Sequence, residues 1–393
     1  MSLADNVPRL LAFRFLSDFI VVMPAIVPLY RQAGLSATEI MLVQAAFSAA
    51  AVLFEVPSGY LADVAGRRRA LLAAMVAQAV AMAAYGLAPG FWAFAAAEVV
   101  LAFAYSLISG TSAAILFDSL RAAGDEGRYH RLESRGEALT RLGTAVASVL
   151  GGFLAVLSLR LPFAVNVATA FAGFLVLRTV VEPPRALLSG HQPLRELLRV
   201  STEALRDRRL QATMVLSTAL LVAGITSIWG YFMRLSAEGI SLGAYGVYFA
   251  LYQAASAAGA ATSHRVSSFL GRRGSVALLA VVPVTLLACA ADGSWRPILL
   301  TPLASAAWGF STPFLLDALN RNIASERRAT VLSVSSLLGR VLLVIVGPAF
   351  GWISDRASDR AAFATLAAVF LLLAAAAGLL HRRAALPAAA ATL

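Results

Sequence analysis

The sequence predicts an all-α membrane protein with twelve transmembrane helices in two pseudo-symmetric six-helix bundles. Three observations support this fold class. First, 60% of the 393 residues are hydrophobic and 13% are charged, with a mean hydropathy of +0.78. Soluble proteins average about 25% charged residues, and disordered chains have low hydrophobicity, so both classes are excluded. Second, apolar stretches long enough to cross about 30 Å of hydrocarbon recur along the chain. Third, the two halves share motifs at matching intervals.

The apolar stretches define the elements in order, since a membrane-spanning helix needs roughly 20 residues. We place them at residues 9–30, 37–62, 70–88, 91–118, 138–158, 161–181, 210–233, 241–264, 275–291, 295–319, 329–353 and 361–380. The longest loop, 182–209, separates an N-terminal bundle (1–181) from a C-terminal bundle (210–393). Four leucines of this loop share one helical face: Leu194, Leu197, Leu198 and Leu205. This pattern suggests an amphipathic helix on the inner membrane surface, and the alternative is a solvated tether.

The positive charge predicts the topology. The net charge is +11, and all 32 basic residues are Arg. If the N-terminus is cytoplasmic, 23 of them lie in cytoplasmic segments, six lie outside and three fall inside helices. The positive-inside rule therefore predicts cytoplasmic termini in a bacterial-type inner membrane. This distribution accounts for the basic charge without a nucleic-acid partner.

Short motifs recur in the two halves. Gly34 precedes Gly66 by 32 residues, Gly239 precedes Gly271 by the same interval, and two Arg residues follow each second glycine. Later in each half an Asp is followed after 23 residues by an Arg: Asp118 and Arg141, then Asp317 and Arg340. These intervals predict a duplicated six-helix unit, an architecture that is typical of transporters.

The loop between the second and third spans reads GYLADVAGRRR over residues 59–69. Gly59 can let another helix approach closely, Gly66 suits a tight turn, and the Asp63 carboxylate can bind Arg67. The segment resembles the loop signature of the major facilitator superfamily, G-x-L-a-D-r-x-G-r-R, with Val64 where the family often has Arg. The twelve spans, two halves and basic central loop extend this resemblance over the whole chain. It implies a transporter that works by alternating access.

The resemblance also implies a cytoplasmic latch. Asp63 and Arg67, with neighbouring Arg68, would join the acid that ends the fourth span, Asp118, and hold the halves together when the cavity opens outward. The plainer alternative is that these charges only anchor the loop at the interface. In the fifth span, Gly143, Gly151 and Gly152 match outer glycines of the family's antiporter motif, which favours export. The family's fourth span usually carries an Arg where this chain has Glu98.

Charged residues inside the spans are the candidates for proton coupling, because an intramembrane charge is costly and normally faces a cavity or a partner. The acids are Asp18, Glu55 and Glu98, and the candidate charge partners are Arg14, Arg141 and Arg340. A carboxyl in a low-dielectric cavity can load and release a proton as access alternates. Alternatively, Arg14–Asp18 and Glu55–Arg141 are fixed ion pairs that only allow the helices to pack.

The second half offers aromatic and amide side chains as candidate substrate contacts: Tyr245, Tyr248, Tyr252, Gln253 and Trp308. Rings opposite carboxylates would suit an amphipathic organic substrate or cation, although aromatic stripes often serve packing. Pro24 and Pro28 interrupt the first span, and Gly224 and Gly230 flank a segment where the seventh could break.

These patterns predict a monomeric, non-enzymatic secondary transporter that exports a small amphipathic organic molecule in exchange for protons, without a cofactor. The sequence contains no metal-ligand cluster and, without Lys, no P-loop for ATP. Two alternatives stay open: proton-coupled uptake, and a sensor or scaffold on the same fold. A scaffold does not need unpaired intramembrane carboxyls, so the surroundings of Asp18, Glu55 and Glu98 discriminate between these classes.

Overall fold

The computed structural model describes residues 5–184, 207–320 and 328–389. Every element in these ranges is a helix, which confirms the predicted all-α fold class. The chain forms two compact units: residues 1–187 with 235–253 make unit 1, and residues 188–234 with 254–393 make unit 2. The leucines predicted to form an amphipathic face in the 182–209 loop lie outside the described residues.

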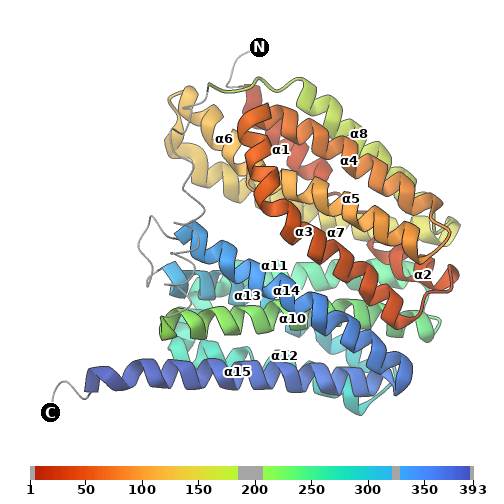
Figure 1. Ribbon diagram of the computed structural model, residues 1–393, viewed down its shortest axis with the longest axis vertical. Coiled ribbons are helices and arrows are strands. Elements are labelled where there is room, and N and C mark those ends of the chain that lie inside the picture. The colour runs from red at the N-terminus through yellow and green to blue at the C-terminus, as the bar shows by residue number, and fades with distance from the viewer. Residues whose placement is uncertain (1–4, 185–206, 321–327, 390–393) are drawn as a thin grey trace. The chain divides into compact units, whose positions relative to one another are not determined.

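Unit 1 contains a bundle of antiparallel helices (Figure 1): α1 (Asn6–Ser17), α2 (Met23–Gln32), α3 (Ala37–Ala65), α4 (Arg67–Leu87), α5 (Phe91–Ile108), α6 (Thr111–Ala122), α7 (Tyr129–Leu157) and α8 (Leu161–Arg178). Ser36 begins α3 with a capping box, because its hydroxyl accepts the Glu39 N–H and the Glu39 carboxylate accepts the Ser36 N–H. Gly66, with φ +110°, forms the turn between α3 and α4. We name the two ends of unit 1 the Gly34 end and the Gly66 end after the turns there.

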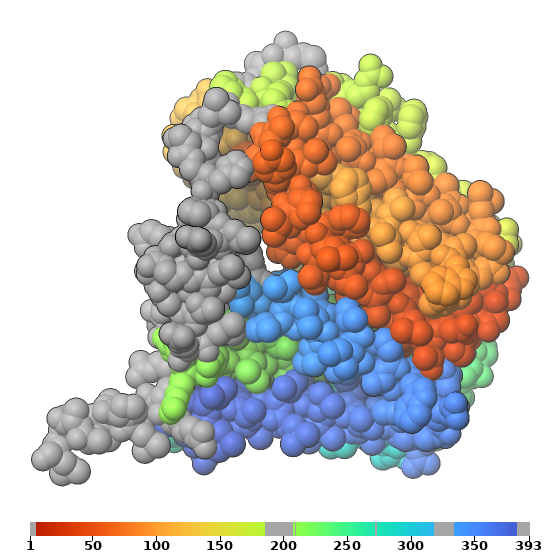
Figure 2. All heavy atoms as spheres, viewed as in Figure 1, coloured from red at the N-terminus to blue at the C-terminus, as the bar shows by residue number. Residues whose placement is uncertain are grey.

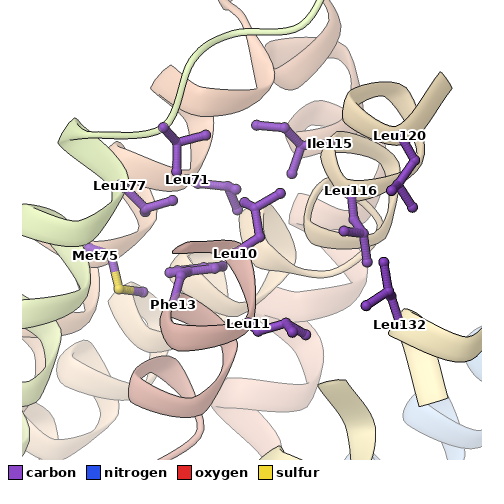
Figure 3. Close-up of a cluster of buried hydrophobic side chains, with 11 residues drawn as sticks. Leu10, Leu11, Phe13, Leu71, Met75, Ile115, Leu116, Leu120, Leu132 and Leu177 are labelled. Carbon is purple, nitrogen blue, oxygen red and sulfur yellow. The ribbon is translucent and has the colours of Figure 1, made fainter. Parts of the chain in front are cut away.

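An apolar cluster in unit 1 joins α1, α4, α6, α7 and α8. Figure 3 shows side chains from these helices converging around Leu10 and Phe13. The fully buried members of the cluster include Leu71, Met75 and Ile115. Lipid is as apolar as these side chains, so close van der Waals packing stabilises such a contact rather than removal from water.

The first predicted span, residues 9–30, which we call helix 1, is interrupted in its middle. The α1 helix ends at Ser17, α2 begins at Met23, and residues 18–22 have no helical structure. Pro24 lies in the first turn of α2. Its ring nitrogen cannot donate to the carbonyl four residues earlier and its ring crowds that carbonyl, so a continuous helix is disfavoured here. The break that Gly224 and Gly230 could have produced in the seventh span is absent, because α10 (Arg208–Ala237) is continuous there.

Ten helices in the described part of the chain are long and apolar enough to cross a membrane. The first predicted span is not among the ten, because it is divided into two short helices. The predicted span 241–264 is also not among them, although it is helical within α11 (Leu242–Leu278).

Unit 2 contains α12 (Val281–Ala291), α13 (Thr301–Asn320), α14 (Arg328–Arg356) and α15 (Asp359–Ala389), with most of α10 and α11. In Figure 2, the coloured part of α15 is open to view in dark blue. The exposed side chains of α15 include Leu371, Leu372 and Leu379. Large exposed apolar side chains on every side of a helical protein are typical of lipid-facing surfaces.

A buried Arg joins three helices at one end of unit 2. The Arg234 side chain is 1% exposed, and its Nε donates to Asp359 Oδ2 at 2.6 Å. Its other nitrogens donate to the carbonyls of Cys289 (2.9 Å) and Asp292 (3.1 Å), which end α12. The guanidinium also lies 4.7 Å from the centre of the Phe363 ring. With a cytoplasmic N-terminus, Arg234 directly follows the seventh predicted span and is one of the six Arg residues expected outside. In the structure it is buried and holds the ends of α12 and α15 against α10.

Removing the carboxylate of this pair should destabilise unit 2. Asp359→Ala leaves a buried cation without its counter-ion, so we expect the free energy of unfolding to fall by about 3 kcal/mol. Chemical unfolding of the purified protein in detergent measures this change. Asp125→Ala, which breaks the exposed pair between Asp125 and Arg128, is the control and should cost less than about 1 kcal/mol. Equal costs for the two variants would contradict this account of Arg234.

Candidate proton-coupling site

Asp18 lies at the start of the interruption in helix 1. It is the residue directly after α1, and its side chain is partly buried. Thr140 on α7 donates its hydroxyl to Asp18 Oδ2 at 3.5 Å, and Thr144 donates to the Asp18 main-chain oxygen at 3.1 Å. Among the described residues no cation forms an ion pair with this carboxyl group.

The alternative in which Arg14 and Asp18 form a fixed ion pair is wrong for this structure. Asp18 caps α1 and its N–H donates to the Arg14 carbonyl at 3.2 Å, but the two side chains form no ion pair. Arg14 instead places Nη1 2.9 Å from Glu133 Oε2 and donates Nε to Ser112 Oγ at 2.8 Å. Arg14 is therefore neutralised by an acid on α7, Glu133, which was not among the predicted charge partners.

Glu98 lies inside a polar cluster near the Gly34 end of unit 1. It follows the start of α5 by seven residues, or about 10 Å, and is 4% exposed. Tyr85 donates its hydroxyl to Glu98 Oε1 at 2.5 Å, and Gln44 donates its amide to the same oxygen at 3.3 Å. The Tyr30 hydroxyl lies 2.8 Å from that of Tyr85 and accepts a second hydrogen bond from Gln44. All partners of this buried carboxyl are neutral.

Glu55, Arg141 and Arg340 do not belong to the surroundings of Asp18 and Glu98 described above. Glu55 on α3 is exposed, and its carboxylate forms no hydrogen bond or ion pair with the part of the chain that the structure describes. The alternative pairing of Glu55 with Arg141 is also wrong, because Arg141 pairs with Glu137 one turn earlier on α7, at 2.7 Å. Arg340 on α14 is half-buried and, within the described ranges, has no acidic partner.

The loop motif forms a polar cluster at the Gly66 end. Arg67 forms an ion pair with Asp118 of α6 and donates to the Ala114 carbonyl at 2.8 Å. The backbone N–H groups of Arg67 and Arg68 each donate to one oxygen of Glu182, at 2.9 and 2.8 Å. A carboxylate suits this position, because the first N–H groups of a helix carry partial positive charge.

Arg68 adds a second link at the same end. Its guanidinium donates to the carbonyls of Leu177 and Arg178, which end α8, at 3.1 and 2.8 Å. Asp63 is exposed. A Cβ atom added to Gly59 would meet nothing within 4 Å, so the close helix approach expected at Gly59 is absent among the described residues.

Two of the five candidate substrate contacts are buried and three are partly buried. Tyr245 and Tyr252 on α11 are 1% and 4% exposed, and Tyr248 and Gln253 are partly buried. The Tyr252 ring lies 6.2 Å from that of Tyr248. Trp308 on α13 lies against α10, 3.5 Å from where a Cβ of Gly224 would be. The rings of Tyr248, Tyr252 and Trp308 therefore pack against neighbouring residues.

Several polar residues around the site were not predicted from the sequence. They lie on different helices and contact the interruption, the Glu98 cluster or Arg14: Tyr30, Gln44, Gln78, Tyr85, Glu133, Thr140, Thr144 and Asn166. The available signal was the presence of amide and acidic side chains inside apolar spans, which need a partner in a membrane.

Comparison with known proteins places this arrangement in a family. The model of the Major Facilitator Superfamily matches residues 10–348. The class G tetracycline resistance protein of Vibrio anguillarum is 27% identical, over 76% of this chain and 75% of its own length.

Solved structures share the fold. A variant of the nucleoside transporter NupG superposes with a TM-score of 0.76 at 15% identity, covering 95% of this chain and 98% of its own. A bacterial homologue of the human lysosomal transporter Spinster gives 0.75 at 17% identity, covering 97% of each chain. The human organic anion transporter MFSD10 gives 0.62 at 17% identity, covering 96% of this chain and 100% of its own. With a family match over most of its length and this shared fold, the chain belongs to the Major Facilitator Superfamily of membrane transporters.

Proposed function

We propose that this transporter exports a small amphipathic organic molecule in exchange for protons. It would work by alternating access, as a monomer, in a bacterial-type inner membrane with both termini in the cytoplasm. One observation carries the proposal: Asp18, Glu55 and Glu98 lie within the predicted membrane spans and, among the described residues, none forms an ion pair with a cation. This is the arrangement that a scaffold on the same fold would not need.

An unpaired carboxyl is suited to carrying a proton. A fixed negative charge within a bilayer costs several kcal/mol, by the most lenient scales about 2.5–3.5. The neutral, protonated acid avoids this cost while access to water is closed. When the site opens, water or a cationic group of the substrate can stabilise the carboxylate, and the proton leaves. Competition of proton and substrate for one carboxyl therefore couples their opposite movements.

Of the three acids, Asp18 is the first candidate and Glu98 the second. Asp18 is partly exposed and has one long hydrogen bond, so substrate and water can reach it. Glu98 is enclosed by hydroxyl and amide groups that can donate to a carboxylate or accept from a carboxylic acid. Glu55 is exposed, which leaves the coupling role to the other two.

The substrate class follows from the candidate cavity residues and from the curated relative. Tyr245, Tyr248, Tyr252, Gln253 and Trp308 would contact an aromatic or amphipathic molecule once the structure opens. Tetracycline is a suitable first probe, because a relative at 27% identity is named for tetracycline resistance. A panel with tetracycline and ethidium can be screened by thermal stabilisation, since a ligand that binds only the folded state raises its stability.

Vesicles of known orientation test the direction. In everted vesicles with an acidic lumen, we expect the best-stabilising probe to accumulate, and accumulation should stop when the pH gradient is collapsed. Acid-driven accumulation into right-side-out vesicles would instead support uptake and overturn export. Binding without movement of the probe in either preparation would favour a sensor.

The motif cluster at the Gly66 end is proposed to act as the latch between the halves, with Asp63, Arg67 and Asp118 as its charges. Asp63→Ala should then favour inward-open states, because the latch stabilises the outward-open state. Distances between spin labels at the ends of the bundles would report this shift. Asp125→Ala removes an acid at the same end of unit 1 that, within the described residues, forms its ion pair with Arg128, three residues along the chain; this variant should leave the distances unchanged. The same distances in both variants would argue against the latch.

A further inference from the structure

The polar groups around Glu98 form a closed ring of hydrogen bonds. Glu98 Oε1 accepts the Tyr85 hydroxyl at 2.5 Å and one N–H of the Gln44 amide at 3.3 Å. The Gln44 amide nitrogen also donates to the Tyr30 oxygen at 3.2 Å, and the oxygens of Tyr30 and Tyr85 lie 2.8 Å apart. Each tyrosine has one O–H, and Tyr85 gives its own to Glu98, so Tyr30 donates to Tyr85. Two donors therefore meet at Glu98 Oε1, which suits a carboxylate.

A proton on Glu98 requires a different order of donors. A proton on Oε2 would have no acceptor among the described residues. A proton on Oε1 can be given to Gln44 directly, or to Tyr85, which then donates to Tyr30, which in turn donates to Gln44. On both routes a hydrogen meets the Gln44 amide nitrogen, and this nitrogen cannot accept it. Half a turn of the amide places its oxygen there instead and completes the ring.

Gln44 is the member of the ring that has room to turn. The side chains of Tyr30 and Tyr85 are 0% and 1% exposed, and their ring centres lie 4.9 and 5.6 Å from that of Phe94. Their oxygens are therefore fixed in place, although the hydroxyl hydrogens can rotate. Gln44 is partly exposed, and the terminal torsion of a glutamine is soft. Its amide can therefore reverse without displacing packed neighbours.

No charged group of the described residues takes part in the ring. Glu98 is the one charged residue of α5. The charged side chains of the surrounding helices in unit 1 either bind another group or are exposed: Arg31, Glu39, Glu55, Asp63, Arg67, Arg68, Arg69, Asp118, Arg121, Arg160 and Arg178. The neutral groups of the ring therefore determine which charge state of Glu98 is stable.

We propose that Gln44 is a positioning residue that lets Glu98 bind and release a proton. It presents its amide nitrogen to the carboxylate and its amide oxygen to the carboxylic acid. In the proposed orientation the ring lies towards the outer face, so Glu98 takes up a proton from outside. This inference rests on the proposed exchange of substrate for protons, and it adds Gln44 to the residues that control that exchange.

Infrared spectroscopy of the purified protein tests the proton on Glu98 without transport. A protonated carboxyl group has a C=O band that a carboxylate lacks, and the part of this band that is missing in Glu98→Gln belongs to Glu98. We expect the Glu98 band to be present in acid buffer and lost in alkaline buffer. A Glu98 band that is absent, or present, at every pH at which the protein is folded would overturn the proposal.

Gln44→Met tests the amide, because methionine has a similar length but lacks the amide donor and acceptor. The carboxylate then loses a charge-assisted hydrogen bond and the acid loses a neutral one, so the Glu98 band should persist to a pH about one unit higher. Gln44→Asn, whose amide is one carbon shorter, serves if Gln44→Met does not fold.

Gln78→Met is the matched control. Gln78 is a buried amide on α4 of the same unit, but it donates to the Ser17 carbonyl at 3.0 Å and does not bond to Glu98. This variant should lose the Glu98 band at the same pH as the wild type. No shift in Gln44→Met, or an equal shift in Gln78→Met, would overturn the role of Gln44.

Transport gives the second readout. The outer face of the protein faces the lumen of everted vesicles. With tetracycline or the best-stabilising probe, the lumenal pH of half-maximal accumulation should be about one unit higher in Gln44→Met than in the wild type. The same lumenal pH in both would show a merely structural role for Gln44. If the wild type accumulates no probe at any pH, the proposed exchange fails, whereas the infrared titration still decides whether Glu98 exchanges a proton under the control of Gln44.

Discussion

Asp18→Asn is expected to abolish proton-driven transport while the folded protein still inserts into the membrane. The substitution keeps the size of the side chain and an oxygen that can accept the Thr140 hydroxyl, and it leaves the bond from Thr144 to the main chain untouched. It removes only the group that can bind and release a proton. We therefore expect helix 1 to stay interrupted in the Asp18→Asn variant, while the coupling of transport to protons is lost.

Transport by everted vesicles distinguishes the loss of proton coupling from a loss of alternating access. With an imposed pH gradient, Asp18→Asn should accumulate no more probe than vesicles without a gradient. Exchange of labelled for unlabelled probe should continue, because it needs alternating access but no net proton movement. Asp125→Asn, in the exposed loop before α7, is the matched control and should behave as the wild type. Gradient-driven accumulation by Asp18→Asn at the wild-type level would remove Asp18 from the mechanism.

Gly151→Ala is expected to have the second large effect. A Cβ atom at Gly151 on α7 would lie 1.9 Å from the Val21 carbonyl oxygen and 3.3 Å from Pro24 Cδ. Both belong to the interrupted segment and the start of α2, and a main-chain atom cannot move aside as a flexible side chain can. Such overpacking costs about 1–3 kcal/mol or more. We expect Gly151→Ala to lower the thermal stability and to abolish transport, because either α7 or the interruption must shift.

Gly86→Ala is the matched control. Gly86 lies in α4 of the same unit, and an added Cβ would make an ordinary contact of 3.5 Å with Phe163. The stability should stay the same or rise, because Ala favours a helix over Gly by about 1 kcal/mol. If Gly151→Ala were as stable and as active in transport as Gly86→Ala, the close approach of α7 to the interruption would not require a glycine at residue 151.

The sequence predicted the fold class because the bilayer imposes a simple rule. Apolar stretches of sufficient length must be helical in lipid, and the boundaries of α3, α4 and α8 lie within a few residues of those expected. The turn at Gly66 was also predictable, since its φ of +110° is readily adopted only by glycine. Pro24 carried a signal for the interruption of helix 1, but Pro28 lies inside α2 without breaking it, so proline alone does not locate a break.

The partners of the charged residues were not predictable in the same way. Periodicity within one helix suggested Arg14 with Asp18, whereas the structure pairs Arg14 with Glu133, which lies more than a hundred residues away. The Glu98 cluster joins α2, α3, α4 and α5, and each of its members alone resembles an ordinary core residue. Such contacts depend on how helices rotate and pack against one another, and a single sequence does not fix these rotations.

The sign of coupling can be measured directly in liposomes that contain the purified protein and a pH-sensitive dye. Liposomes loaded with tetracycline, or with the probe that most stabilises the protein, are diluted into probe-free buffer of the same pH. Exchange of probe for protons predicts that the lumen becomes acidic, whichever way the protein is inserted, and that Asp18→Asn and protein-free liposomes show no such change. A lumen that becomes alkaline, or one that acidifies equally with Asp18→Asn, would contradict proton exchange through Asp18.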